Sequence, residues 1–247
     1  MNIYERRHTI QANECDMFSL WRPGAVMVAM QETASEHSSI LGVGMKEMTE
    51  NGIAWVLSRG RVQMHRMPHC SERITIRTYP LAPRHLFWPR VHIFFDEQGV
   101  EIGQAVCLWL VMDMTDRRAV KNSYVESRMP LNRELSCSIG MPATVYPIDA
   151  PCVKRLLEPQ FTDADCLGHV NNTRYLDWCC NALGYPVMKD YYLSSFDVNY
   201  TAETRLNEQL TTALCMQGEH FSYTGCMDDT QHFAISGRLS PRCSNSP

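Results

Sequence analysis

The stretch Pro23-Gly-Ala-Val-Met-Val-Ala-Met30 opens an apolar run that continues without a helix breaker to Ile40-Leu41. A proline near its start and Gly42 just past its end predict a helix of about four turns. The run is apolar on most sides, which is typical of a helix that is buried inside a domain. A fold built around this stretch therefore has a long helix at its centre.

Strand-like segments follow this helix, over residues 53–62, 74–77, 91–95 and 100–112. They are rich in apolar and β-branched residues, and Ile74 and Ile76 alternate with polar neighbours. The last two segments flank Asp96-Glu-Gln-Gly99, which predicts a hairpin turn and hence antiparallel pairing.

The second half of the chain repeats this order of elements. Asn171-Asn172 is expected to cap a helix in which Tyr175, Trp178, Cys179 and Ala182 have the spacing of one helical face, and Gly184 ends it. Strand candidates follow over residues 193–200, 210–216, 221–227 and 233–239. A long helix followed by antiparallel strands, found twice, predicts an α+β fold in which each sheet wraps its helix.

The two predicted modules cover residues 1–118 and 159–242. Residues 119–158 contain several prolines and little periodicity, so we expect a linker that wraps the surface of the protein.

Composition limits the classes of function. The chain has 247 residues and a formal net charge of -4, which favours neither nucleic acid nor a membrane as a partner. Its first residues do not resemble a secretory signal, and we expect a cytoplasmic protein. Eleven cysteines without a C-x-x-C pair predict reduced, mostly buried thiols rather than a disulfide framework.

The residues that carry chemistry lie just ahead of the second helix, in Asp163-Ala-Asp165-Cys-Leu-Gly-His169-Val-Asn-Asn-Thr-Arg-Tyr175. A carboxylate and an imidazole at that point supply acid–base capacity, and a helix N-terminus offers N–H groups for a developing oxyanion. The spacing also fits a purely structural interpretation, in which the aspartates cap the helix and His169 completes a turn.

This stretch resembles the motif of plant and bacterial acyl–acyl carrier protein (acyl-ACP) thioesterases, which read roughly D-x-D-x-N-x-H-V-N-N-x-x-Y. Glu203 matches the family's glutamate, which follows the motif histidine by thirty-four residues, and Trp109–Arg118 is similar to the family's W-V-M-x-N-x-x-T-R-R segment. The resemblance implies tandem hot-dog modules, the second catalytic and the first holding the acyl chain. It implies hydrolysis of fatty acyl-ACP in fatty acid biosynthesis, without a cofactor or metal and with acyl-ACP as the partner.

By this resemblance Asp165, His169 and Glu203 are the catalytic residues, and Gly168, Val170 and Asn171 contact the substrate. We expect Glu203 to activate a water or to attack directly, Asp165 to orient the water or carbonyl, and His169 to position or protonate the leaving thiolate. The N–H groups from Gly168 to Val170 would receive the oxyanion.

The sequence departs from the family pattern at two positions. Leu167 replaces the motif asparagine and cannot hydrogen-bond a carbonyl or a water. Thr204 stands where plant members commonly carry cysteine, which argues against a cysteine nucleophile. Met27, Met30, Trp55 and Met64 of the first module either line an acyl tunnel or are ordinary core.

Three other functions remain open on the sequence. They are an acyl-CoA thioesterase, a hot-dog enoyl hydratase that adds water without releasing a thiol, and a non-catalytic acyl-thioester sensor. A compact monomer and a homodimer are both compatible with two such modules.

Overall fold

The computed structural model of the protein describes residues 2–242, which form two compact units. Unit 1 comprises the residues up to 21 and residues 26–142, and unit 2 comprises residues 22–25 and those from 143 onward. In the described part of the chain, no helix combines the length and the apolar character that crossing a bilayer requires.

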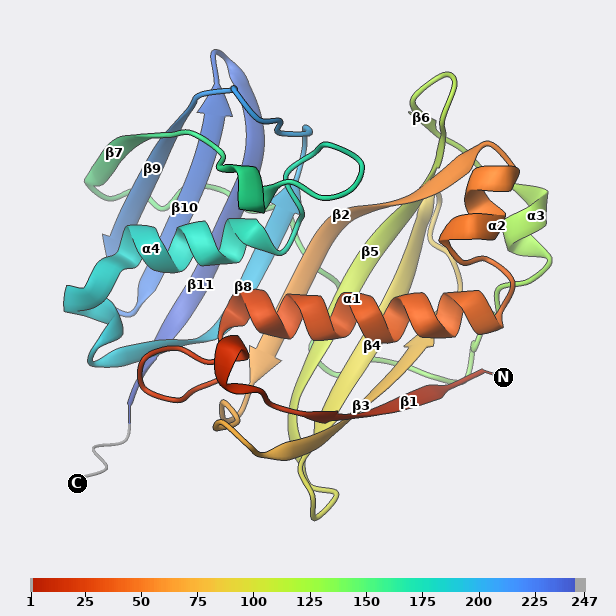
Figure 1. Ribbon diagram of the computed structural model, residues 1–247, viewed down its shortest axis with the longest axis horizontal. Coiled ribbons are helices and arrows are strands. Elements are labelled where there is room, and N and C mark those ends of the chain that lie inside the picture. Colours follow the sequence, from red (N-terminus) through yellow and green to blue (C-terminus); the bar gives the residue numbers. More distant parts are fainter. Residues whose placement is uncertain (1, 243–247) are drawn as a thin grey trace. The chain divides into compact units, whose positions relative to one another are not determined.

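Unit 1 contains a five-stranded antiparallel sheet in the order β1-β3-β4-β5-β2, with a short β6 paired to β5. Its strands are β1 (Tyr4–Thr9), β2 (Ile53–Met64), β3 (Arg73–Pro80), β4 (Phe87–Phe95), β5 (Glu101–Asp113) and β6 (Arg118–Ala119). Its helices are the 3-10 turn η1 (Ala12–Glu14), α1 (Pro23–Ile40), α2 (Met45–Glu50) and α3 (Ser123–Glu126). The long α1 crosses one face of this sheet (Figure 1).

Unit 2 contains a second five-stranded antiparallel sheet, in the order β7-β9-β10-β11-β8. Its strands are β7 (Cys152–Leu157), β8 (Tyr191–Tyr200), β9 (Leu210–Gln217), β10 (His220–Met227) and β11 (Thr230–Pro241). The 3-10 turn η2 (Phe161–Asp163) precedes α4 (Arg174–Met188), which crosses the face of its own sheet (Figure 1). Gly184 adopts a positive φ of 73° and kinks α4 where the sequence predicted its end.

The two units have the same topology. If β7–β11 are numbered as the first to fifth strands of unit 2, both sheets have the same strand order, first-third-fourth-fifth-second. Each unit also carries a 3-10 turn and a long helix between its first two strands. This confirms the α+β architecture of one helix and one antiparallel sheet, made twice. The predicted cap is wrong in detail: Thr173 precedes α4, and Asn171 Oδ1 instead accepts hydrogen bonds from the Thr173 N–H and hydroxyl.

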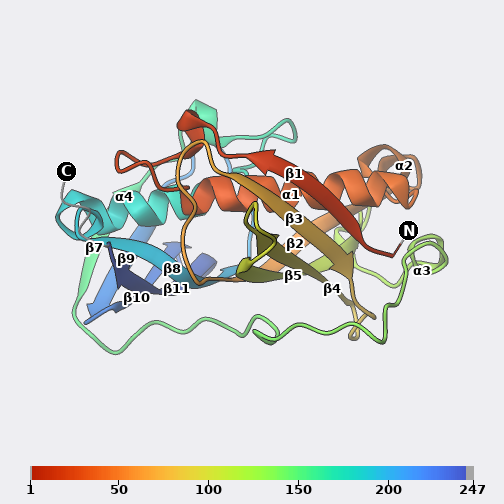
Figure 2. The ribbon, with the colours of Figure 1, turned by 90° about the horizontal axis from the view of Figure 1, so that it is seen from below.

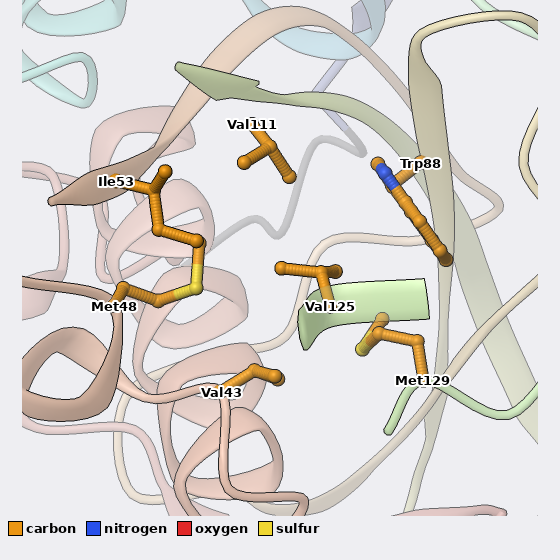
Figure 3. Close-up of a cluster of buried hydrophobic side chains, with 7 residues drawn as sticks. All are labelled: Val43, Met48, Ile53, Trp88, Val111, Val125 and Met129. Atoms are coloured by element: carbon orange, nitrogen blue, oxygen red, sulfur yellow. The ribbon is translucent and has the colours of Figure 1, made fainter. Parts of the chain in front are cut away.

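A hydrophobic cluster closes one end of unit 1. It joins α2, α3 and the sheet through seven buried side chains: Val43, Met48, Ile53, Trp88, Val111, Val125 and Met129 (Figure 3). Burying each such side chain contributes roughly 1.5–3 kcal/mol. Met27, Met30 and Met64 are also buried core residues, with at most 4% of their surface exposed.

The segment that we expected to be a linker, residues 119–158, contains regular structure. It includes α3, which packs into unit 1, and β7, which pairs with β9 at the edge of the unit 2 sheet. Between them, the chain runs along the sheet face opposite the long helix in each unit (Figure 2). The Tyr79 hydroxyl donates to the Ser136 carbonyl, and the Val145 N–H donates to Asn199 Oδ1. The prediction missed β7 because this strand is exposed along most of its length and has no apolar alternation.

A disulfide joins Cys152 of β7 to Cys215 of β9, which corrects the expectation of reduced, mostly buried thiols; of the free cysteines that the structure describes, only Cys107 and Cys179 are buried. The two residues face each other in the register of these strands, 63 positions apart in the sequence. That pairing could not be foreseen while β7 was interpreted as linker.

Candidate active site

A tight turn presents the imidazole of His169. Within it, the Asp165 N–H donates to the His169 carbonyl at 2.8 Å, and the Gly168 N–H donates to the Asp165 carbonyl at 3.0 Å. Asp165 Oδ1 accepts from the Leu167 N–H at 2.9 Å. Gly168 has a φ of 78°, which a residue with a side chain rarely adopts, so glycine suits this turn.

The turn is fixed to the segment that follows β8. The Val170 N–H donates to the Thr204 carbonyl at 2.8 Å, and His169 forms an antiparallel bridge with Arg205. This pairing brings His169 next to the residue that precedes Thr204 in the chain, which is Glu203. Two positions thirty-four residues apart are thereby held side by side by backbone hydrogen bonds.

His169 and Glu203 form an imidazole–carboxylate pair. Their Nε2 and Oε2 atoms are 3.1 Å apart, within the reach that acid–base catalysis requires. The His169 side chain is 24% exposed and that of Glu203 is 42% exposed, so water and a substrate can reach both. The pair can accept a proton at one group and deliver one from the other.

Arg205 is a site residue that the sequence reasoning missed. Its Nη2 lies 3.6 Å from the same Glu203 oxygen that faces His169. The signal was available, because Arg205 stands two positions after Glu203 and alternate residues of an extended segment share a side. The carboxylate therefore faces two nitrogen groups.

The structure gives Asp165 a role in the turn, and the same role recurs in unit 1. There Asp16 Oδ1 accepts from the N–H groups of Phe18 and Leu20, at 2.9 and 3.0 Å. Because the aspartate closes this turn in both units, its position ahead of the helix does not by itself indicate catalysis.

Two of the three N–H groups predicted to receive an oxyanion, those of Gly168 and Val170, are engaged elsewhere, as is the N–H of the predicted substrate contact Asn171. The N–H groups of Gly168, Val170 and Asn171 donate to the carbonyls of Asp165, Thr204 and Asp163. The Gly168 and Val170 N–H groups already donate to backbone carbonyls of the protein, so neither is an unpaired donor in this structure. Leu167 projects from the turn with 64% of its surface exposed.

The corresponding turn of unit 1 lacks the acid–base pair. The Trp21 N–H donates to the Pro68 carbonyl, and Leu20 forms the bridge with His69, so Leu20 occupies the place of His169. Since Pro68 corresponds to Thr204, the preceding residue Met67 corresponds to Glu203. Of these two corresponding turns, the one in unit 2 therefore carries the imidazole and the carboxylate.

Comparison with protein families identifies both halves of the chain. Residues 1–125 match the acyl-ACP thioesterase N-terminal domain, and residues 149–233 match the acyl-ACP thioesterase C-terminal domain. The second match contains the whole turn, His169 and Glu203.

Similar proteins with a curated description include two plant enzymes. The chain is 24% identical to the chloroplastic dodecanoyl-[acyl-carrier-protein] hydrolase of Cinnamomum camphora, over 78% of this chain and 54% of that protein. It is 25% identical to the chloroplastic palmitoyl-acyl carrier protein thioesterase of Gossypium hirsutum, over 81% and 52%. The chain thus spans about half the length of the curated relatives it matches.

Solved structures share the fold over nearly the whole chain. An acyl-ACP thioesterase from Bacteroides thetaiotaomicron matches with a TM-score of 0.87 and 20% identity, covering 96% of this chain and 98% of that one. The 12:0-ACP thioesterase from Umbellularia californica matches with a TM-score of 0.84 and 19% identity, covering 97% and 98%. These matches confirm the tandem hot-dog fold. With both of its domains recognised along the sequence, the chain belongs to the acyl-ACP thioesterase family.

Proposed function

We propose that the protein hydrolyses the thioester of a fatty acyl-ACP, releasing a free fatty acid and the carrier thiol. The observation that carries this proposal is the 3.1 Å contact between His169 Nε2 and Glu203 Oε2, in the unit that matches the family's C-terminal domain. The acyl carrier protein is the partner that the family implies. The first module, which lacks this pair, has the role of holding the acyl chain.

The chemistry follows from the two groups. The Glu203 carboxylate removes a proton from a water whose oxygen attacks the thioester carbonyl carbon. When the carbon–sulfur bond breaks, His169 gives a proton to the departing thiolate. The proton held by Glu203 can then pass to His169 across their direct contact, which returns both groups to their starting state.

The first prediction concerns these two side chains. Glu203→Gln and His169→Ala should each lower kcat by a factor of about 100 or more, because each removes a proton-transfer group. Thiol release from a panel of acyl-ACP and acyl-CoA chain lengths measures the effect. Glu219→Gln and His220→Ala are matched controls, because both residues lie on the surface of unit 2 away from the turn.

The same assay separates the competing functions. Preference for acyl-CoA would replace the proposed carrier, and water addition to an enoyl thioester without thiol release would indicate a hydratase. Near wild-type turnover in both variants would refute the assignment of the pair, and binding without any turnover in the wild type would indicate a sensor.

A further inference from the structure

The segment that carries Glu203 is held by the first residues of β11. The Thr201 N–H donates to the His232 carbonyl at 2.9 Å, and the Ala202 N–H donates to the same carbonyl at 3.3 Å. The Thr201 hydroxyl donates to the Gln231 carbonyl at 2.6 Å. These bonds fix the backbone on the N-terminal side of Glu203.

A side-chain hydrogen bond fixes the other side. Thr204 Oγ1 lies 2.9 Å from His232 Nδ1, and both residues are buried, at 0% and 3% exposed. The Thr204 carbonyl accepts from the Val170 N–H, in the turn that presents His169. Thr204 thus connects β11 to the histidine turn, and Glu203 is its immediate neighbour.

The surroundings of Thr204 are aromatic and buried. The Tyr175 ring lies 5.3 Å from Tyr200 and 4.9 Å from Phe233, measured between centroids. Burial raises the pKa of Tyr175 to about 12, and a hydrogen bond with Thr204 acts in the opposite direction. In such a place an unpaired hydroxyl or imidazole nitrogen is costly, so the Thr204–His232 bond has a strongly preferred geometry.

Unit 1 makes the same backbone turn without this bond. Its His65 N–H donates to the Ile102 carbonyl at 2.9 Å, as Thr201 does to His232, and Pro68 stands in the place of Thr204. Neither Ile102 nor Pro68 offers a side chain for a hydrogen bond. The fold therefore does not need the bond, and the bond occurs in the unit that carries the acid–base pair.

We propose that Thr204 and His232 are positioning residues for catalysis, which hold the Glu203 carboxylate at its distance from His169. The inference rests on the proposed function, because it assigns a purpose to the placement of Glu203. Both residues are buried, so they act through the groups that they hold, namely Glu203 and the turn that presents His169. Small displacements of a reacting group lower the rate strongly, which makes this bond consequential for turnover.

The test compares variants that remove the bond with variants that keep it. Thr204→Val and His232→Leu should lower kcat by roughly 10- to 100-fold with little change in KM, because the chemical step loses its alignment. Thr204→Ser retains the hydroxyl, and His232→Asn retains a side chain that can hydrogen-bond to the Thr204 hydroxyl. Each of these variants should therefore keep most of the wild-type kcat. Thr212→Val is the matched control, since Thr212 is a buried threonine of unit 2 whose hydroxyl donates to the Arg155 carbonyl.

Thermal unfolding and the nitrogen NMR signals of the His169 imidazole are recorded for the same variants. Loss of kcat and altered His169 signals in Thr204→Val but not in Thr212→Val would support the proposal. Equal kcat in the two variants, with equal losses of melting temperature, would overturn it. If the wild type turns over no acyl thioester, the proposed function fails, and the His169 signals alone decide whether the positioning role stands.

Discussion

At the scale of single residues, the site departs from its family at Leu167. The leucine N–H closes the turn on Asp165, and its side chain projects into solvent. The turn therefore needs only the backbone at this position. The leucine side chain can therefore be replaced by the asparagine of the family motif without loss of a hydrogen bond in the turn.

Leu167→Asn should raise kcat by about fivefold, because one added hydrogen bond to the water or the carbonyl contributes about 1 kcal/mol. The melting temperature should change little. Thiol release measures the gain, and Leu167→Ala shows the effect of removing the leucine alone. An unchanged kcat in both variants would mean that position 167 does not contact the reacting atoms.

At the scale of elements, a polar layer lies between α1 and β4. Arg90 Nη1 donates to His37 Nδ1 at 3.0 Å, and its Nη2 donates to Ser38 Oγ at 3.2 Å. His92 Nε2 donates to the Met30 carbonyl at 3.1 Å. Burial lowers the pKa of His92 to about 3, and the Arg90 charge adds to this shift.

This layer predicts a dependence of stability on pH. Below a pH of about 6.5 the unfolded chain protonates His92 while the folded chain does not, so stability falls as the pH drops toward 3, by up to ~1.4 kcal/mol per pH unit. His92→Gln keeps a donor for Met30 and does not titrate, so its free energy of unfolding should fall less steeply. Urea unfolding at pH 7, 6 and 5 measures both slopes, and parallel slopes would contradict the prediction.

At the scale of the whole molecule, the sequence predicted the long helices and eight of the strands because their apolar patterns are strong. It missed β1 and β7, which expose every second residue or nearly all of them, and the two-residue β6. For the site, the family motif and the spacing to Glu203 identified the pair that the structure brings together. Two features of the site depend on the pairing of the histidine turn with the segment after β8, which no local sequence pattern shows. They are the hydrogen bond from the Val170 N–H to the Thr204 carbonyl and the position of Arg205 beside Glu203.

The Cys152–Cys215 disulfide joins β7, the first strand of unit 2, to β9 of the same sheet. Reduction should lower the free energy of unfolding by about 2–4 kcal/mol, because the unfolded chain regains a long loop. Thermal unfolding with and without reductant measures this loss. Cys152→Ser should be insensitive to reductant, while Cys166→Ser should respond as the wild type does; a wild type that ignores reductant would contradict the prediction.

Leu20 and Met67 stand in unit 1 where His169 and Glu203 stand in unit 2. If this pair is the reaction centre, two units of the same topology are served by one centre, which lies in unit 2. A mutation in unit 1 cannot abolish proton transfer directly. Natural variation in that half can therefore change which acyl chain is held while the two proton-transfer groups stay in place.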